Sequence, residues 1–310
     1  MKKIIISIIL CLSYISSNAI AIIPQYSNYI FPLAEPEYLP MPITKDLTKA
    51  LALSEKQKYQ KTAITEQDLD LSEASLANTF LREVYLIGAN LSYANLSYSN
   101  FSHANLSYAN LNHTSLRCSD LSQTDLRKAD LSYADLRGIN LSNADLRESN
   151  LTGADLTSAI LTNANLSNAN LSWAILIDTK VNGANLTGTI LHATELINAI
   201  LDRTVLDGAI LTSAILTKAI LTNAKLRNVN LTGAILNFAD LSNADLSSSN
   251  LTRVKLLKTN FKEANLSETT LDEVDFQKSR SNMTRTTLIG AKGLTEGQKR
   301  FALMFKAICD

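Results

Sequence analysis

Hydrophobic residues recur at every fifth position over about two thirds of this chain. From Leu71 to Phe276 each fifth residue is Leu, Phe or Val, without a break. The residue two before each of these is nearly always small or β-branched, most often Ala, as at Ala89, Ala94 and Ala104. A fixed short period over such a length is typical of a solenoid, in which each repeat packs on its neighbours.

Neither an α-helix nor a flat strand can bury this row. In a helix five residues rotate the side chain by about 500°, so successive Leu residues spread around the cylinder. In a strand the side chains alternate, so an odd spacing puts successive Leu residues on opposite faces. A chain that stays extended for about three residues and then turns within each pentad points both the small residue and the Leu inward. The period therefore predicts a flat-sided coil stacked on copies of itself.

The repeated unit A-(N/D)-L-(S/T/R)-x resembles that of the pentapeptide-repeat family. The resemblance implies an all-β solenoid: a right-handed quadrilateral β-helix with four pentads per coil, filled by the Leu and the small residue. Residues twenty apart would then stack on one face at the ~4.8 Å spacing of neighbouring strands. We assign residues 67–294 to this β-helix and expect short helical caps at both ends.

The first residues have the features of a secretory signal peptide, which we place at residues 1–21. Lys2 and Lys3 precede an apolar run from Ile4 to Leu12, and Ala19-Ile20-Ala21 matches a cleavage site. The apolar run is too short to span a membrane. We therefore expect a periplasmic or secreted protein without stable membrane insertion.

Two further segments precede the repeats. Residues 22–43 hold all five prolines and four aromatic residues, which predicts an extended arm because proline fixes φ and lacks an N–H donor. The arm either packs along the solenoid or docks on another molecule. In residues 44–66, Leu47, Ala50 and Leu51 have helical spacing. We expect a helical cap there, covering the otherwise exposed strand edges of the first coil.

The pentad register fails after Phe276. Further on, Thr295-x-x-Gln298 forms a capping box, and Phe301, Met304, Phe305 and Ile308 make an apolar stripe. These features predict an amphipathic helix over residues 295–310 that covers the last coil. The alternative is a dimerising helix, since C-terminal segments of the family sometimes dimerise.

The sequence contains few residues arranged as catalysis would require. His103, His113 and His192 are spaced so that they do not converge, and no catalytic or phosphate-binding motif occurs. Stacking separates Cys118 from Cys309 by far more than a disulfide allows. We predict that the protein is not an enzyme, binds no cofactor or metal, and acts as an exported scaffold or protein-binding module.

Charge separates this function from its alternative, a DNA-mimicking regulator of a nucleic-acid enzyme such as gyrase. The family offers a precedent for acidic β-helices that imitate duplex DNA, and such mimicry needs a field of a single sign. Here 29 basic residues balance 29 acidic ones. Arg117, Arg127, Arg137 and Arg147 each follow a Leu beside the Asp-rich positions. We also expect no binding of nucleic acid itself.

Two outward-facing sets of residues are candidate interaction surfaces. In the second half the residue before the Leu changes from Asn or Asp to β-branched, and we name five of these residues the Ile belt: Ile190, Ile200, Ile210, Ile215 and Ile220. Exposed apolar surface of this extent usually marks an interface, here with a protein partner or a second copy. The alternative is that β-branched residues only favour extended backbone.

The second set lies two residues after the Leu. Tyr93, His113, Tyr133, Gly153 and Trp173 are spaced by twenty and would form one row. Such a row can hold a peptide, a glycan or a partner surface by stacking. The alternative is that the side chains only pack on one another, with Gly153 interrupting them.

Overall fold

The computed structural model describes residues 44–59 and 69–309. The chain divides into two units, Met1–Lys45 and Asp46–Asp310. The expected signal peptide and the arm of residues 22–43 lie outside the described residues.

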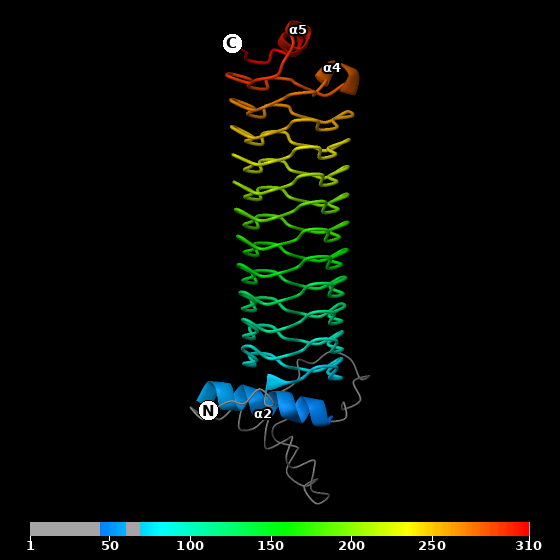
Figure 1. Cartoon of the computed structure of the whole chain (residues 1–310), viewed down its shortest axis with the longest axis vertical. Helices are drawn as coiled ribbons and strands as arrows, with labels where there is room; N and C mark the ends of the chain where they lie inside the picture. Colours follow the sequence, from blue (N-terminus) through cyan, green and yellow to red (C-terminus); the bar gives the residue numbers. More distant parts are fainter. Residues whose placement is uncertain (1–43, 60–68, 310) are drawn as a thin grey trace, which may run out of the picture. The chain divides into compact units, whose positions relative to one another are not determined.

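From Asp70 onwards the chain winds into coils of twenty residues (Figure 1). Parallel backbone bridges join Asp70 to Asn90, Asn90 to Asn110, and continue at this spacing as far as Asn250 and Thr270. One bridge falls in each pentad, at the residue before the Leu, which we call the bridge position. The Leu N–H then donates to the next coil, as from Leu91 to the carbonyl of Asn110 at 2.7 Å. The predicted solenoid is confirmed.

The expectation of regular β-strands is only partly right. Within residues 69–309 the bridges are isolated, and none extends into a strand. The reason is a turn in every pentad, closed by a bond from the small residue to the preceding Leu, such as Ala94 N to Leu91 O at 3.1 Å. Four of the five residues belong to the turn, so only one is left to bridge.

The second residue after each Leu, here called the turn position, has a positive φ. The angle is 59° at Tyr93 and 55° at His113. Type II turns require this conformation at their third residue, and side chains other than Gly and Asn adopt it at a cost. The sequence carries a signal for it, because eight of its ten glycines occupy turn positions: Gly88, Gly138, Gly153, Gly183, Gly188, Gly208, Gly233 and Gly290.

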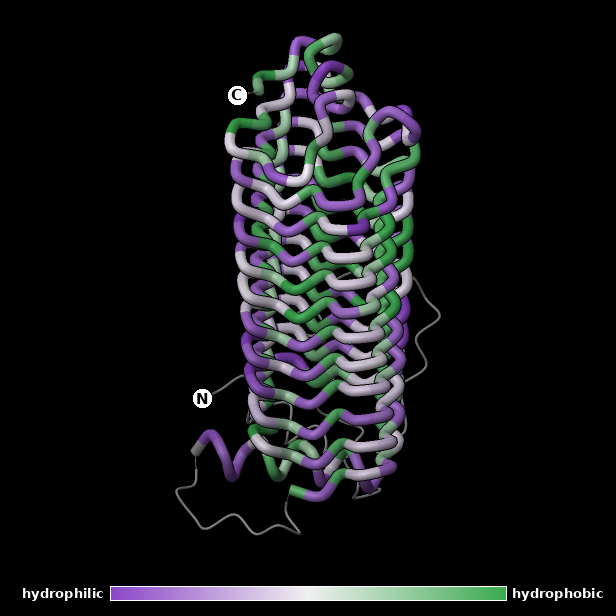
Figure 2. Tube along the Cα trace, turned by 45° about the horizontal axis from the view of Figure 1, so that its top comes forward, coloured by the Kyte–Doolittle hydropathy of each residue, from purple (hydrophilic) through white to green (hydrophobic). Residues whose placement is uncertain are grey.

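The interior contains the Leu row and the small residues two before it. Ala89 and Leu91 are fully buried, as is Thr114. The Thr114 hydroxyl donates to the carbonyl of Leu91 at 2.8 Å. Among the described residues no buried side-chain N or O lacks a hydrogen-bond partner. Ala, Ser and Thr are therefore interchangeable here, and hydrophobic residues recur at the same places in successive coils (Figure 2).

Helix α2 (Lys45–Tyr59) lies against the first coil and buries Ala50 and Leu53. Its polar side chains bind backbone groups that have no preceding coil to pair with, and Lys49 donates to the carbonyl of Asp70. In three more such bonds a backbone N–H of the first coil donates to a side chain of the helix: Ser75 N to Asp46 Oδ2 at 2.9 Å, Tyr85 N to Ser54 Oγ at 2.9 Å, and Ile87 N to Gln57 Oε1 at 2.7 Å. Helix α2 thus covers the strand edge, within the segment 44–66 for which a helical cap was expected.

At the other end a short helix, α4 (Phe276–Ser279), interrupts the repeat. Two extra residues shift the bridges, so Asn260 pairs with Asn282 and Thr270 with Lys292. Helix α5 (Glu296–Met304) follows and begins with the expected capping box of Thr295 and Gln298. The helix expected over residues 295–310 therefore ends earlier, at Met304, and Ile308 of its predicted stripe instead forms a last bridge with Thr287. None of the helices within the described residues is long and apolar enough to cross a membrane.

Candidate binding surface

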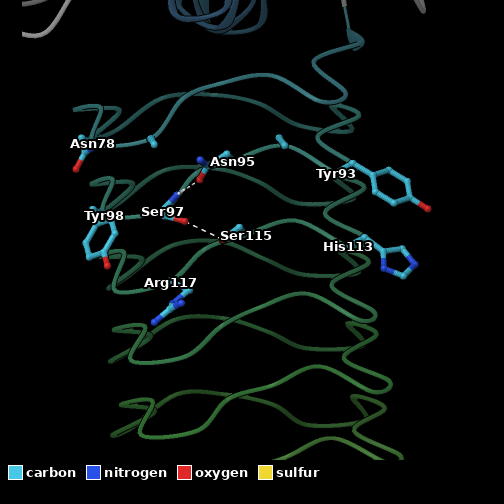
Figure 3. Close-up of a pocket in the computed structure, with 10 residues that line it drawn as sticks. Asn78, Tyr93, Asn95, Ser97, Tyr98, His113, Ser115 and Arg117 are labelled. Atoms are coloured by element: carbon cyan, nitrogen blue, oxygen red, sulfur yellow. Dashed lines mark hydrogen bonds between the residues drawn. The ribbon is translucent and has the colours of Figure 1, made fainter.

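A shallow groove of about 560 Å³ lies on one flat side of the first coils (Figure 3). Tyr93 and His113 stand at one corner and Tyr98 at the other. The groove is open, and its floor is made by polar side chains: Asn95, Ser97 and Ser115, with Arg117 near the Tyr98 corner. Aromatic rings therefore flank a polar floor.

Three rings at one corner stack into what we call the aromatic column: Tyr93, His113 and Tyr133. The ring centroids are 4.9 Å apart between Tyr93 and His113 and 5.2 Å apart between His113 and Tyr133, with planes within 13° of parallel. Gly153 ends the column. Trp173 instead makes an edge contact with His192 at 5.9 Å. The structure thus brings together three of the predicted row residues and leaves Trp173 apart from them.

The fold does not require aromatic side chains at these corners. Other pentads place Glu73, Lys128 or Ser158 at the same turn position with the same backbone conformation. Tyr93 is 61% exposed and Tyr98 59%, so neither residue contributes much to the core. A bulky side chain at positive φ costs free energy without compensating burial. The fold therefore does not dictate aromatic residues at these corners, and their rings are available for binding a partner.

The floor of the groove is held by hydrogen bonds among its own residues. Asn95 Oδ1 accepts from Ser97 N at 3.2 Å, and the Ser97 and Ser115 hydroxyls lie 2.7 Å apart. Tyr98 and the floor residues were not among the candidates predicted from the sequence. The signal for them was present, because Tyr93 and Tyr98 occupy turn positions of consecutive pentads and so must stand at neighbouring corners.

Several Asp carboxylates of the next coils are paired with arginine. Arg137 Nε donates to Asp135 at 2.7 Å and lies 3.6 Å from Asp155. The hydrogen bond from Arg137 lowers the pKa of Asp135, and partial burial opposes this effect. Arg127 with Asp125 and Arg147 with Asp145 repeat the arrangement: Arg127 Nε and Arg147 Nε donate at 2.9 Å and 2.8 Å. The negative field of these coils is thereby neutralised locally.

The Ile belt is divided among the sides of the coil. Ile190 bridges to Ile210 on one side and Ile200 to Ile220 on another, while Ile215 lies on a third. Ile190, Ile210 and Ile220 are 38–40% exposed, and Ile200 and Ile215 are less exposed. Polar residues continue the first two rows beyond these pairs, at Asn230 and Asp240. Each side therefore offers at most two neighbouring Ile residues of the belt.

Groups suited to metal binding or catalysis do not gather anywhere in residues 44–59 and 69–309. No three His, Cys, Asp or Glu side chains in this part of the chain could hold a metal ion. His192 Nδ1 is hydrogen-bonded to the Thr212 hydroxyl at 2.7 Å. Neither Cys118 nor Cys309 forms a disulfide within the described residues.

Comparison with known families identifies the class of protein that this fold represents. The family model described as pentapeptide repeats (8 copies) matches residues 70–277 in overlapping segments: 70–107, 94–132, 104–143, 125–163, 139–178, 161–192, 190–228, 224–261 and 239–277. The chain belongs to the pentapeptide-repeat family. No curated protein sequence is significantly similar to it.

Several solved structures of this family are similar to the chain. HetL from the cyanobacterium Nostoc sp. strain PCC 7120, a protein involved in heterocyst differentiation regulation, is 31% identical; the match covers 73% of this chain and 91% of HetL, with a TM-score of 0.33. A thylakoid-lumen protein of Arabidopsis thaliana, AT2G44920, is 26% identical over 32% of this chain and 69% of that protein, with a TM-score of 0.31. QnrB1, a plasmid-mediated fluoroquinolone resistance protein, is 18% identical over 66% and 94%, with a TM-score of 0.33.

Proposed function

We propose that this protein is an exported, non-catalytic scaffold or protein-binding module, and that its first coils carry a binding surface. The observation that carries the proposal is the groove between Tyr93 and Tyr98, whose exposed rings the fold does not require. Exposed tyrosines around a polar floor are typical of surfaces that bind other proteins, because each ring supplies apolar area with few rotatable bonds.

Three finer points belong to the same proposal. The coil is right-handed and quadrilateral, as the family resemblance implies. Export rests on the signal peptide predicted at residues 1–21. The partner is a protein, and a homodimer through the C-terminal helix or the Ile belt is a second mode of association. DNA mimicry has less support, because pairs such as Asp135 with Arg137 prevent a field of one sign.

The test is photo-crosslinking of the full chain in its own cell. We expect crosslinked species that disappear when Tyr93→Ala is combined with Tyr98→Ala. The matched control combines Ser213→Ala with Lys218→Ala, which changes two turn positions on the same corners six coils later. Equal crosslinking by both variants would exclude the groove as the binding surface.

Export is tested separately by sequencing the N-terminus of the protein recovered from cell fractions. A mature chain that begins at Ile22 in the periplasm or medium supports the proposal. An uncleaved cytoplasmic chain would overturn export and revive the regulatory alternative.

A further inference from the structure

One side of the coil gathers apolar side chains beyond the groove. Its bridge ladder runs from Asn95, on the floor of the groove, to Lys255. From residue 92 to residue 272 the residue after the Leu is polar in every pentad except three, and all three lie on this side. We call its outward apolar residues the apolar strip: Ile175, Ile177, Ile197, Ile215, Ile235 and Leu257. Ile215 also belongs to the Ile belt.

Aromatic side chains flank the apolar strip at both corners. Trp173 stands at one corner and Phe238 at the other, 60% and 45% exposed. No other turn position beyond Tyr133 holds an aromatic residue. The fold requires neither ring, since Ser213 and Lys218 occupy the same two corners with the same backbone conformation. An apolar surface with aromatic edges is typical of a contact with another molecule.

The charges of this side change sign midway. The coils of residues 153–198 carry acidic residues there and those of residues 213–258 carry basic ones: Asp155, Asp178 and Glu195, then Lys218, Lys255 and Lys258. Arg253, on the same side, is already paired with Glu273 at 2.8 Å. Within residues 69–309 no ion pair engages Glu195, Lys218 or Lys255. Two such sides that face each other in opposite directions therefore place acidic residues against basic ones.

We propose that a second copy of this chain binds along the apolar strip in the antiparallel direction. The two-fold axis passes between the coil of Glu195 and the coil of Ile215, where the charge changes sign. Equal steps from this axis bring Ile175 of one copy to Ile235 of the other. A parallel arrangement would instead bring each acidic coil against its own copy.

The outer coils of the strip fit the same register. Asp155 of one copy comes level with Lys255 of the other, and Glu195 comes level with Lys218. Antiparallel copies also bring the same corner row together, so Trp173 meets Gly233. A Cβ atom at residue 233 would have only Ser213 Oγ within 4 Å, at 3.8 Å, so this corner leaves room for the indole ring.

Sedimentation equilibrium of the purified full chain tests the pairing of charges. Glu195→Lys and Lys218→Glu should each weaken self-association by about tenfold or more, because each sets like charges against one another across the interface. An equimolar mixture of the two variants should recover association, because the mixed dimer alone pairs both charges. Lys180→Glu is the matched control: it makes the same change of charge on a neighbouring side and should leave association unchanged.

The direction is tested by crosslinking with bismaleimidoethane in a chain that carries Cys118→Ser and Cys309→Ser. Ile175→Cys mixed with Ile235→Cys should give crosslinked dimers. Neither variant alone should do so, because identical residues of the two copies then lie three coils, about 14 Å, apart along the axis. Crosslinked dimers from either variant alone would show a parallel arrangement and overturn the proposal.

The inference deepens the self-association named in the proposed function, and its failure can be told apart from failure of partner binding. A wild-type chain that stays monomeric throughout the micromolar range would overturn the dimer. So would a mixture that does not recover association, or an effect of Lys180→Glu equal to that of Lys218→Glu. These measurements leave the groove untouched, so crosslinks that depend on Tyr93 and Tyr98 report on the protein partner independently.

Discussion

The coils of residues 90–155 and those of residues 190–225 share one interior and differ in their outer surface. Both bury Leu at 0–1% exposure and both bridge to residues twenty further on. In the first region every bridge position holds Asn, Asp or Ser. In the second it holds Ile, Val, Glu or Lys. The interior alone therefore does not determine what the bridge position carries.

The polar bridge residue caps the turn that follows it. Asn140 Oδ1 accepts from the backbone N–H of Ser142 at 3.1 Å and from its hydroxyl at 2.7 Å. Asn140 also donates to Asp120 in the preceding coil at 3.0 Å. An Ile at the same position can do neither. The preference for Asn and Asp in the repeat is thus explained by turn capping, without any reference to function.

Coils with Ile at the bridge position are linked from coil to coil instead. Their polar contacts join the residues after the Leu, as in the bond of 2.6 Å from the Thr222 hydroxyl to Asp202. Arg227 binds Asp207 of the preceding coil in the same way. The repeat thus tolerates two kinds of outer surface. In one, the bridge residue caps the following turn and can also bond to the preceding coil; in the other, the polar bonds between coils come from the residues after the Leu.

The largest expected effect should be the same in both regions. Leu111→Ala and Leu211→Ala remove fully buried side chains from the same side of the coil, five coils apart. Each should lower the free energy of unfolding by about 2–5 kcal/mol, because a cavity is left in a closely packed interior. Urea unfolding of the two variants measures this. A difference above about 1 kcal/mol would refute the equivalence of the two interiors.

A smaller effect should separate the regions. Asn140→Ile removes a turn cap and a bond between coils, and we expect a loss of about 1–2 kcal/mol in the free energy of unfolding. Ile220→Asn, on the same side of the coil, offers the N–H of Thr222 a new cap and should change stability by less than about 0.5 kcal/mol. Equal losses in thermal or urea unfolding would show that capping does not distinguish the two regions.

The fold could be predicted because the interior follows a rule that the sequence displays directly. A Leu at every fifth position, with Ala or Thr two before it, leaves only a coil that turns within each pentad. The absence of continuous strands from residues 69–309 and the positive φ at the turn position could not be predicted from hydrophobicity. Both depend on the hydrogen bonds of the local turn, which the pattern of apolar residues does not specify. Glycines such as Gly153 and Gly208 were the available signal.

The candidate site was predicted only in part, for a geometric reason. Spacing by twenty aligned Tyr93, His113 and Tyr133 correctly, because stacked coils keep corners in line. The position of Trp173 depends on side-chain rotation towards His192, which no spacing encodes. Predicting the groove between Tyr93 and Tyr98 also depends on the rule that consecutive turn positions stand at neighbouring corners.

The smallest expected effect on stability, and the sharpest test of the outer surfaces, concerns the Ile belt. Combining Ile210→Asp with Ile215→Asp places charges on two neighbouring sides, where the side chains are partly exposed. We expect reduced self-association or reduced partner binding, because an apolar contact surface acquires charge. Sedimentation velocity and partner capture measure the two outcomes.

The matched control combines Asn165→Asp with Asn170→Asp. It adds the same charge at consecutive bridge positions outside both the belt and the groove, so it separates a local effect from one of net charge. Unchanged sedimentation and unchanged partners for the belt variant would mean that these Ile residues only favour extended backbone. Each side carries no more than two neighbouring Ile residues of the belt, so a partner that depends on the belt must contact more than one side. Either Asp substitution alone should therefore weaken binding less than the two together.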